Sequence, residues 1–118
     1  MRVLVVEDDA IGSMCLQSQL ERFGHEVLAV AYDGSQAVKL AGELAPELVV
    51  MDVSLPKITG IEAARQILAQ HTIPIIFLSG FTPDELKDRT GEFAQCACLS
   101  KPVSSVELQA AIDAVCTR

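Results

Sequence analysis

Charged and hydroxyl side chains follow four short apolar runs in this sequence. The side chains are Glu7, Asp8, Asp9, Asp52, Ser79 and Lys101, and the runs that precede them are residues 3–6, 48–51, 75–78 and 96–100. If the runs are strands of one parallel sheet, their C-terminal ends share the edge at which open α/β sheets bind ligands. Carboxylates, a hydroxyl and an ammonium group gathered there would suit a metal ion and a phosphoryl group.

Each of these residue types has a defined part in such chemistry. Mg²⁺ binds oxygen ligands, usually one or two carboxylates together with phosphate oxygens, and Glu7, Asp8 and Asp52 could supply the carboxylates. Asp52 is the candidate nucleophile because a carboxylate can accept a phosphoryl group as an acyl phosphate. Lys101 would neutralise charge on that group, and Ser79 would donate a hydrogen bond to it.

Each residue alone also has an ordinary structural explanation. An isolated acidic triplet is more often a solvated loop than a metal site. Lys101 could be a surface lysine, Ser79 could satisfy its own strand end, and Asp52 with Pro56 and Gly60 could form only a turn. The recurrence of reactive groups at four strand ends is what favours a site.

The elements that would position these groups alternate regularly. Apolar runs are separated by longer segments of helical period, which is typical of βα units. The predicted strands are 2–6, 26–31, 47–52, 74–79 and 96–100. The predicted fold is α/β, a (βα)5 doubly wound five-stranded parallel sheet. Right-handed crossovers would place helices on both faces, which explains why the strands are apolar throughout.

Helix faces and ends can be predicted in the same way. Apolar residues at helical spacing predict the buried faces, namely Leu16, Leu20 and Phe23, then Ala37, Ala41 and Leu44, then Ile61, Ala64 and Leu68, and finally Leu108, Ile112 and Val115. Gly24 should end the first helix, and capping residues predict three starts, at Asp33 with Gln36, at Thr82 with Pro83 and Glu85, and at Ser104 with Glu107.

Composition bounds the class of protein. The chain has 118 residues, 50% of them apolar, and a formal net charge of −7. We expect one domain, residues 1–118, with no output domain in this chain. The negative charge argues against direct nucleic-acid binding, since no basic cluster could contact phosphates. The apolar runs are too short for a membrane span or a signal peptide, so we expect a cytoplasmic location.

The cysteines and histidines give little indication of a metal site or a disulfide. We expect Cys96 and Cys98 to point to opposite faces of the last strand, which would disfavour a shared metal or a disulfide. We interpret these two, with Cys15 and Cys116, as small hydrophobic side chains.

Four motifs together resemble one family. They are VLVVEDD (3–9), VVMDVSLPKITG (49–60), IIFLSG (75–80) and LSKP (99–102), and they occur in the order found in the receiver domain of two-component response regulators. The resemblance extends from Met1 to about Val115. It implies a flavodoxin-like strand order, 2-1-3-4-5.

The resemblance also implies roles for individual residues. Glu7 and Asp8 match the family's acidic pair that holds Mg²⁺, and the main-chain carbonyl of Ser54 would be a further ligand. Asp52 matches the phosphoacceptor, which is also a metal ligand.

Two further positions match the family's phosphoryl contacts. Ser79 corresponds to the Ser/Thr that turns toward the phosphoryl group, and Lys101 to the lysine that pairs with it. The bond between Lys101 and Pro102 is usually cis in this family.

The implied function is a phosphorylation switch in a signalling domain rather than an enzyme. A histidine kinase or a histidine phosphotransfer protein would donate the phosphoryl group to Asp52. The domain would promote this transfer and its own dephosphorylation. The change would alter the surface of the fourth helix, fifth strand and fifth helix, and so regulate a downstream protein or an attached output domain. The domain would be a monomer or a phosphorylation-dependent dimer, with no membrane or direct nucleic-acid partner.

The sequence departs from the family at two positions. Cys98 stands where receivers commonly carry Tyr or Phe, which puts the aromatic form of output coupling in doubt. Thr59 stands where an aspartate is common.

Two other functions remain open from the sequence. One is a receiver-like protein-binding module that acts independently of phosphorylation, for which partner affinity would be unchanged by Asp52→Ala. The other is a small Mg²⁺-dependent phosphatase, for which turnover of a generic phosphate ester would be the sign. The chain is short for that class and has no insertion that could cover a substrate.

Overall fold

A computed structural model describes residues 1–80 and 96–116 of the chain. Its strands are β1 (Arg2–Val6), β2 (Glu26–Ala31), β3 (Leu48–Asp52), β4 (Ile75–Ser79) and β5 (Cys96–Ser100). They form one parallel sheet in the order β2-β1-β3-β4-β5. The predicted (βα)5 sheet and its strand order are therefore confirmed, and β3 and β4 each begin one residue later than predicted.

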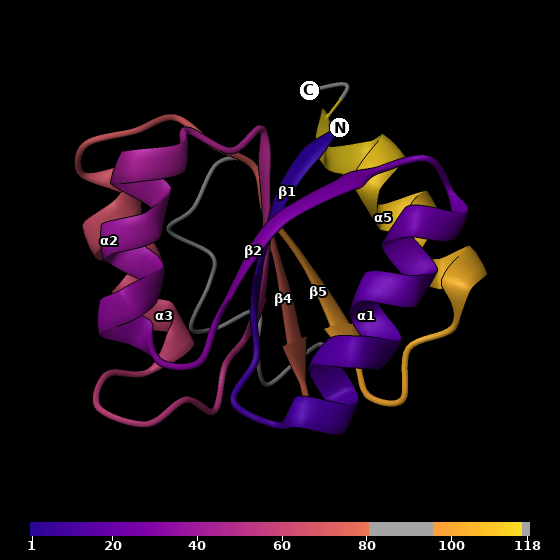
Figure 1. Cartoon of the computed structure of the whole chain (residues 1–118), viewed down its shortest axis with the longest axis horizontal. Coiled ribbons are helices and arrows are strands. Elements are labelled where there is room, and N and C mark those ends of the chain that lie inside the picture. Colours follow the sequence, from indigo (N-terminus) through magenta and orange to yellow (C-terminus); the bar gives the residue numbers. More distant parts are fainter. Residues whose placement is uncertain (81–95, 117–118) are drawn as a thin grey trace.

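Helices cover both faces of this sheet, as predicted. The described helices are α1 (Ala10–Arg22), α2 (Gly34–Leu44), α3 (Gly60–Leu68) and α5 (Ser105–Cys116). In Figure 1, α2 and α3 lie on one side of the sheet, and α1 and α5 lie on the other. The fourth predicted helix, with Thr82, Pro83 and Glu85 at its start, lies outside the described residues.

Two apolar clusters fill the space between the sheet and its helices. Side chains of β3 alternate between them, so that Val49 and Met51 pack toward α2 and α3 while Leu48 and Val50 pack toward α1 and α5. All four are fully buried. Burial on both faces is the reason that the strands read as continuous apolar runs.

Short polar side chains fix where the helices begin. Asp33 accepts a hydrogen bond from the Gln36 amide at 2.7 Å, and Ser104 accepts one from the Glu107 amide at 3.1 Å, as the predicted caps require. Thr59 caps α3 through the Glu62 amide at 3.2 Å. The residue at which the family often has an aspartate thus has a structural role here.

The end of α1 corrects one prediction. Gly24 has φ +85, and its amide donates to the Glu21 carbonyl while the His25 amide donates to the Leu20 carbonyl, both at 3.0 Å. This pair of bonds is a Schellman motif. Phe23 was predicted on the buried face but is 42% exposed, because the helix ends at Arg22 and the backbone at Phe23 has already left the helical path.

The expectation for the last strand was wrong. Cys96 and Cys98 both pack against the cluster on the side of α2 and α3, whereas Ala97 and Leu99 pack on the opposite face. Residues two apart in a strand share a face because successive side chains alternate. Within the described residues, no two cysteines are joined by a disulfide.

Within the part of the chain that the structure describes, no helix has the length and apolar character needed to cross a membrane.

Tight packing at Gly60 connects α3 to the strand that ends in Asp52. A Cβ atom at Gly60 would overlap the main-chain carbonyl oxygen of Asp52 and lie 2.9 Å from the Val53 Cα, and both neighbours are backbone. We expect Gly60→Ala to lower the free energy of unfolding by about 1–3 kcal/mol, the usual cost of overpacking. Denaturation in urea followed by circular dichroism would measure it.

The matched control is Gly42→Ala. Gly42 is an exposed position inside α2, where an added Cβ would meet only His71 Nε2 at 3.9 Å. This substitution should raise stability by up to about 1 kcal/mol, because alanine has the higher helix propensity. Equal stabilities for the two variants would contradict the packing described at Gly60.

Candidate functional site

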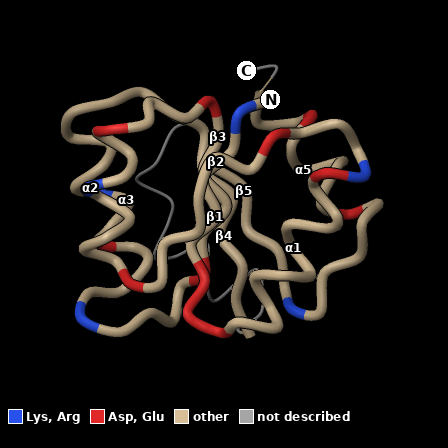
Figure 2. Tube along the Cα trace, viewed as in Figure 1, with Lys and Arg blue, Asp and Glu red and all other residues tan. Residues whose placement is uncertain are grey.

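The predicted site residues lie at the C-terminal edge of the sheet. Glu7 follows β1, Asp52 ends β3, Ser79 ends β4 and Lys101 follows β5. Val6 pairs with Met51 in the sheet, so the residues that follow them are neighbours. In Figure 2 the acidic stretch at the end of β1 lies at the end of the sheet toward which the strand arrows of Figure 1 point. The parallel arrangement therefore brings the four strand ends together.

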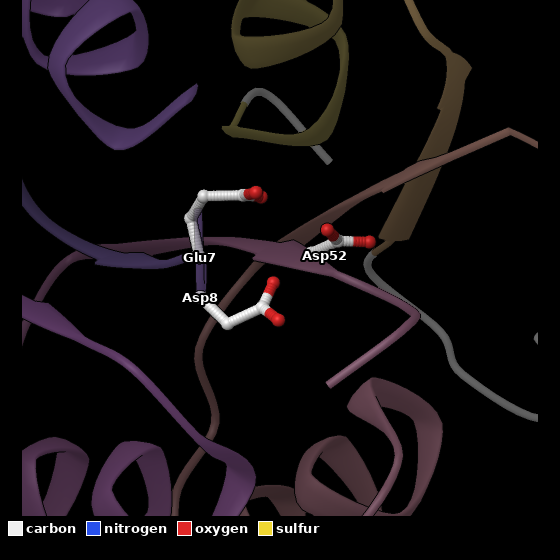
Figure 3. A group of neighbouring side chains, drawn as sticks. All are labelled: Glu7, Asp8 and Asp52. Carbon is white, nitrogen blue, oxygen red and sulfur yellow. The ribbon is translucent and has the colours of Figure 1, made fainter. Parts of the chain in front are cut away.

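Three carboxylates form a compact cluster at this edge. Glu7, Asp8 and Asp52 each offer an oxygen, and these oxygens all lie within 4.8 Å of one another. Figure 3 shows the carboxylates of Glu7 and Asp8 directed to the side on which Asp52 lies. Glu7 is 2% exposed and Asp52 is 6% exposed, whereas Asp8 faces solvent. Hard oxygen ligands at this separation fit the requirements of Mg²⁺.

Lys101 lies among these carboxylates. Its Nζ donates to Asp52 Oδ2 at 2.8 Å and to Glu7 Oε2 at 3.3 Å. The other oxygen of Asp52, Oδ1, accepts the amide of Ser54 at 3.0 Å. Both carboxylate oxygens of Asp52, the candidate nucleophile, thus accept a hydrogen bond, and one of the two donors is a charged ammonium group.

The backbone around Lys101 is tied to the end of β4. The amide of Lys101 donates to the carbonyl of Ser79 at 2.8 Å, and the peptide bond from Lys101 to Pro102 is cis, as the family resemblance implies. Ser79 is 1% exposed, so its hydroxyl is enclosed at the strand end. The structure brings Glu7, Asp52 and Lys101 into direct contact and places Ser79 on the adjoining strand.

Burial sets the protonation of Glu7. Burial raises the pKa of the Glu7 carboxyl from 4.5 to about 7, aided by the hydrogen bond and the negative charge of Asp52, while Lys101 opposes the change. For Lys101, burial would lower the pKa, but the hydrogen bond and charge of Asp52, with those of Glu7, raise it overall. Without a metal, the folded state therefore holds a proton on Glu7 over the pH range from 4.5 to about 7, in which the unfolded chain has largely released it.

This difference gives the metal-free protein a pH dependence. A carboxyl whose pKa is higher in the folded state stabilises the fold fully below the unfolded value of 4.5. That contribution is lost as the pH rises through about 7. Crowded carboxylates thus make the site costly to keep fully charged with Lys101 as its cation, unless a metal ion also binds.

Asp9 and Gly12 support Glu7 in a way that the sequence did not reveal. Asp9 caps α1 by accepting the Gly12 amide at 2.8 Å, and its own amide lies 3.4 Å from Glu7 Oε1. A Cβ at Gly12 would lie 3.0 Å from Asp9 Oδ2 and 3.2 Å from Glu7 Oε1. Asp9 therefore positions the first turn of α1 and is not one of the clustered carboxylates. In the sequence, this arrangement is indicated by a short polar residue with a glycine three positions later.

A groove beside α1 borders the site at Glu7 and Lys101. Its volume is about 560 Å³. Glu7, Asp9 and Lys101 line it together with the apolar side chains of Leu16 and Leu78. The groove reaches Glu7 and Lys101, whereas Asp8 and Asp52 do not line it.

Removing the ammonium group should destabilise the metal-free protein. In Lys101→Gln, Asp52 and Glu7 lose their shared cation, and the pKa of Glu7 should rise further. Breaking a fully buried pair costs about 3–5 kcal/mol. The side chain of Lys101 is 40% exposed, so we expect a smaller loss, roughly 1–3 kcal/mol. Urea denaturation at pH 8 without divalent cations would measure it.

Lys57→Gln is the matched control. Lys57 pairs with Asp33 at 3.4 Å, but its side chain is 66% exposed, so this change should cost less than about 1 kcal/mol. Equal losses in the two variants would contradict a special role for the buried ion pairs.

Known proteins resemble this chain in both sequence and fold. The profile of the response regulator receiver domain matches residues 3–113. The transcriptional regulatory protein PdtaR of Mycobacterium tuberculosis H37Rv is 38% identical over 117 residues, which are 99% of this chain and 57% of that protein. PhoP of Bacillus subtilis 168, the alkaline phosphatase synthesis transcriptional regulatory protein, is 36% identical over 118 residues, covering 99% of this chain and 49% of PhoP. This chain thus spans about half the length of these relatives.

Solved structures of other proteins have a similar fold. The response regulator domain of Thermotoga maritima CheB superposes with a TM-score of 0.90 at 28% identity, covering 100% of this chain and 97% of that one. The signal receiver domain of a modulated diguanylate cyclase from Desulfovibrio desulfuricans G20 gives 0.87 at 31% identity, covering 98% and 93%. This chain belongs to the response regulator receiver domain family.

Proposed function

We propose that the chain is a phosphorylation-dependent signalling switch whose phosphoacceptor is Asp52. The observation that carries the proposal is a buried carboxylate held by an ammonium group, with Lys101 Nζ 2.8 Å from Asp52 Oδ2 and two further carboxylates beside it. A histidine kinase or a histidine phosphotransfer protein would be the donor.

The residues support the transfer mainly through position and charge. A carboxylate oxygen of Asp52 forms the new P–O bond as the P–N bond to the donor histidine breaks. Since phosphoryl transfer has a loose transition state, little more is needed than alignment and neutralisation of the phosphoryl oxygens. Lys101 already contacts the acceptor carboxylate and would pair with one of those oxygens. Ser79, at the adjoining strand end, would donate a hydrogen bond to another.

A metal ion would complete the charge balance. Glu7, Asp8, Asp52 and the main-chain carbonyl of Ser54 would hold Mg²⁺, and the close spacing of the three carboxylates supports this assignment. When bound, the ion supplies further positive charge for the phosphoryl oxygens. Metal binding would require Glu7 in its ionised form, since a proton on its carboxyl competes with the metal.

The response to phosphorylation would be transmitted through β5, the strand that leads into Lys101. Movement of Ser79 toward a phosphoryl group would act on Lys101, whose amide it binds, and thus on β5 and α5. Such a switch biases two existing states and is limited by their difference in energy. The affected surface would recognise a downstream protein or an attached output domain. The alternative, a module that binds partners independently of phosphorylation, predicts the same partner affinity for the wild type and for Asp52→Ala.

The first test is chemical phosphorylation. The protein is incubated with acetyl phosphate and Mg²⁺, and its intact mass is measured. We expect the addition of one phosphoryl group, which should be lost in Asp52→Ala and on chelation of the metal. No addition to folded wild-type protein, or equal addition to Asp52→Ala, would contradict the assignment of Asp52.

The second test uses the pH dependence of metal binding. Because the pKa of Glu7 is raised to about 7 in the metal-free protein, protons should compete with Mg²⁺ below that pH. A fixed Mg²⁺ concentration should therefore raise the melting temperature more at pH 8 than at pH 6. Calorimetry would measure both shifts.

Glu7→Gln is the control for this experiment. It keeps the size of the side chain but removes the titrating group, so the Mg²⁺ shift should become smaller and nearly independent of pH. A wild-type shift that is equal at both pH values would show that Glu7 does not titrate against the metal.

A further inference from the structure

The outward face of α1 is apolar where the helix begins and basic where it ends. Ile11 is 73% exposed and Met14 is 65% exposed. The exposed side chains of Cys15 and Ser18 continue the same stripe at helical spacing, and Arg22 ends the helix. Large apolar side chains that gather on one exposed face, rather than singly, mark an interaction site. These five residues are called the α1 face below.

The α1 face lines a second groove. Its volume is about 510 Å³, and Gln19 of α1 and Ser105 at the start of α5 complete its lining. Glu21 is exposed as well, but among the described residues it is Arg22, and not Glu21, that lines the groove. The groove therefore has apolar side chains at one end and a basic side chain at the other.

The acidic residues before α1 make this face complementary to itself. Asp8 and Asp9 are exposed directly before the helix, and Asp9 caps it, whereas Arg22 lies in its last turn. An antiparallel second copy of α1 would place each basic end beside the other acidic end. A parallel copy would instead bring like charges together. Charge complementarity of this kind fixes the orientation of partners, and self-complementarity is what a two-fold interface requires.

The spacing of these residues gives the register of such a pair. Cys15 lies seven positions after Asp8 and seven positions before Arg22. A two-fold axis that passes beside Cys15 therefore sets Arg22 of one copy opposite Asp8 of the other. Ile11 and Met14 of both copies then lie around the axis, between the two charged contacts. An apolar centre with a polar rim is the usual composition of a protein interface.

We propose that the unphosphorylated chain forms a two-fold homodimer through antiparallel packing of the α1 faces. The helix has 13 residues, so it is only about 20 Å long. Interfaces below about 1,200 Å² belong to transient complexes, so we expect a dissociation constant of roughly 10 μM to 1 mM. Asp8 is also one of the three clustered carboxylates. The dimer would thus bring a guanidinium group of one copy to the edge of the other copy's site.

Sedimentation equilibrium of the unphosphorylated protein tests the dimer. The chain concentration should span the expected dissociation constant, and Mg²⁺ is left out so that no ion occupies Asp8. We expect a single monomer–dimer equilibrium. Met14→Lys and Arg22→Glu should each raise the dissociation constant about tenfold or more, because each change occurs twice across a two-fold axis. Circular dichroism would show that both variants are folded.

Lys39→Glu is the matched control. It makes the same change in charge as Arg22→Glu, at an exposed position of α2 on the opposite side of the sheet (Figure 1). Its dissociation constant should equal that of the wild type. Wild-type protein that stays monomeric over the whole range, or a dimer that neither α1 variant weakens, would overturn the proposal.

A crosslinking experiment on the wild type tests the register. Cys15 is exposed, whereas the other three cysteines are half-buried. Packed helices lie about 8–10 Å apart, so the two copies of Cys15 should be within reach of a short bifunctional maleimide. Peptide mass spectrometry should find Cys15 linked to Cys15, and Cys15→Ser should lose the crosslinked dimer. Crosslinked dimers joined only through other cysteines would place the interface elsewhere and contradict the proposal.

Discussion

The contact of one ammonium group with two buried carboxylates is the constraint around which this domain is organised. Lys101 Nζ lies 2.8 Å from Asp52 and 3.3 Å from Glu7, and both carboxylates are almost fully enclosed. One cation cannot balance three clustered carboxylates, and burial, aided by the hydrogen bond and charge of Asp52, raises the pKa of Glu7 to about 7. The site is thus electrostatically incomplete, which is the condition under which a divalent cation and a phosphoryl group bind favourably together.

The fold explains how such a costly cluster is maintained. Glu7, Asp52 and Lys101 follow three different strands, and a parallel sheet with apolar packing on both faces holds these ends in fixed register. Local devices then refine the position of each group. Asp9 begins α1 directly after Glu7, and the packing of Gly60 on the Asp52 carbonyl fixes the exit from β3. The apolar packing on both faces of the sheet therefore offsets the repulsion among the carboxylates at its C-terminal edge.

Much of this arrangement could be predicted from the sequence, because strand ends in a parallel sheet must share an edge. The apolar runs predicted the strands of the sheet, and the residues directly after them identified Asp52 and Lys101 as candidate site residues. The contact of Lys101 with Glu7 as well as Asp52 could not be predicted, since it depends on how far each side chain reaches. The exposure of Phe23 depended on where α1 ends, whereas the shared face of Cys96 and Cys98 follows from the alternation of side chains along a strand. Side-chain depth and contact, rather than topology, were what the sequence left undetermined.

The central claim is that this cluster directs a phosphoryl group to Asp52 and to no other carboxylate. The most direct measurement is chemical trapping of the acyl phosphate. Protein labelled with acetyl phosphate and Mg²⁺ is reduced with borohydride, which converts a phosphorylated aspartate to homoserine, and the peptides are sequenced by mass spectrometry. The account predicts homoserine at position 52 alone. Homoserine at position 8 or 9, with Asp52 unmodified, would contradict it.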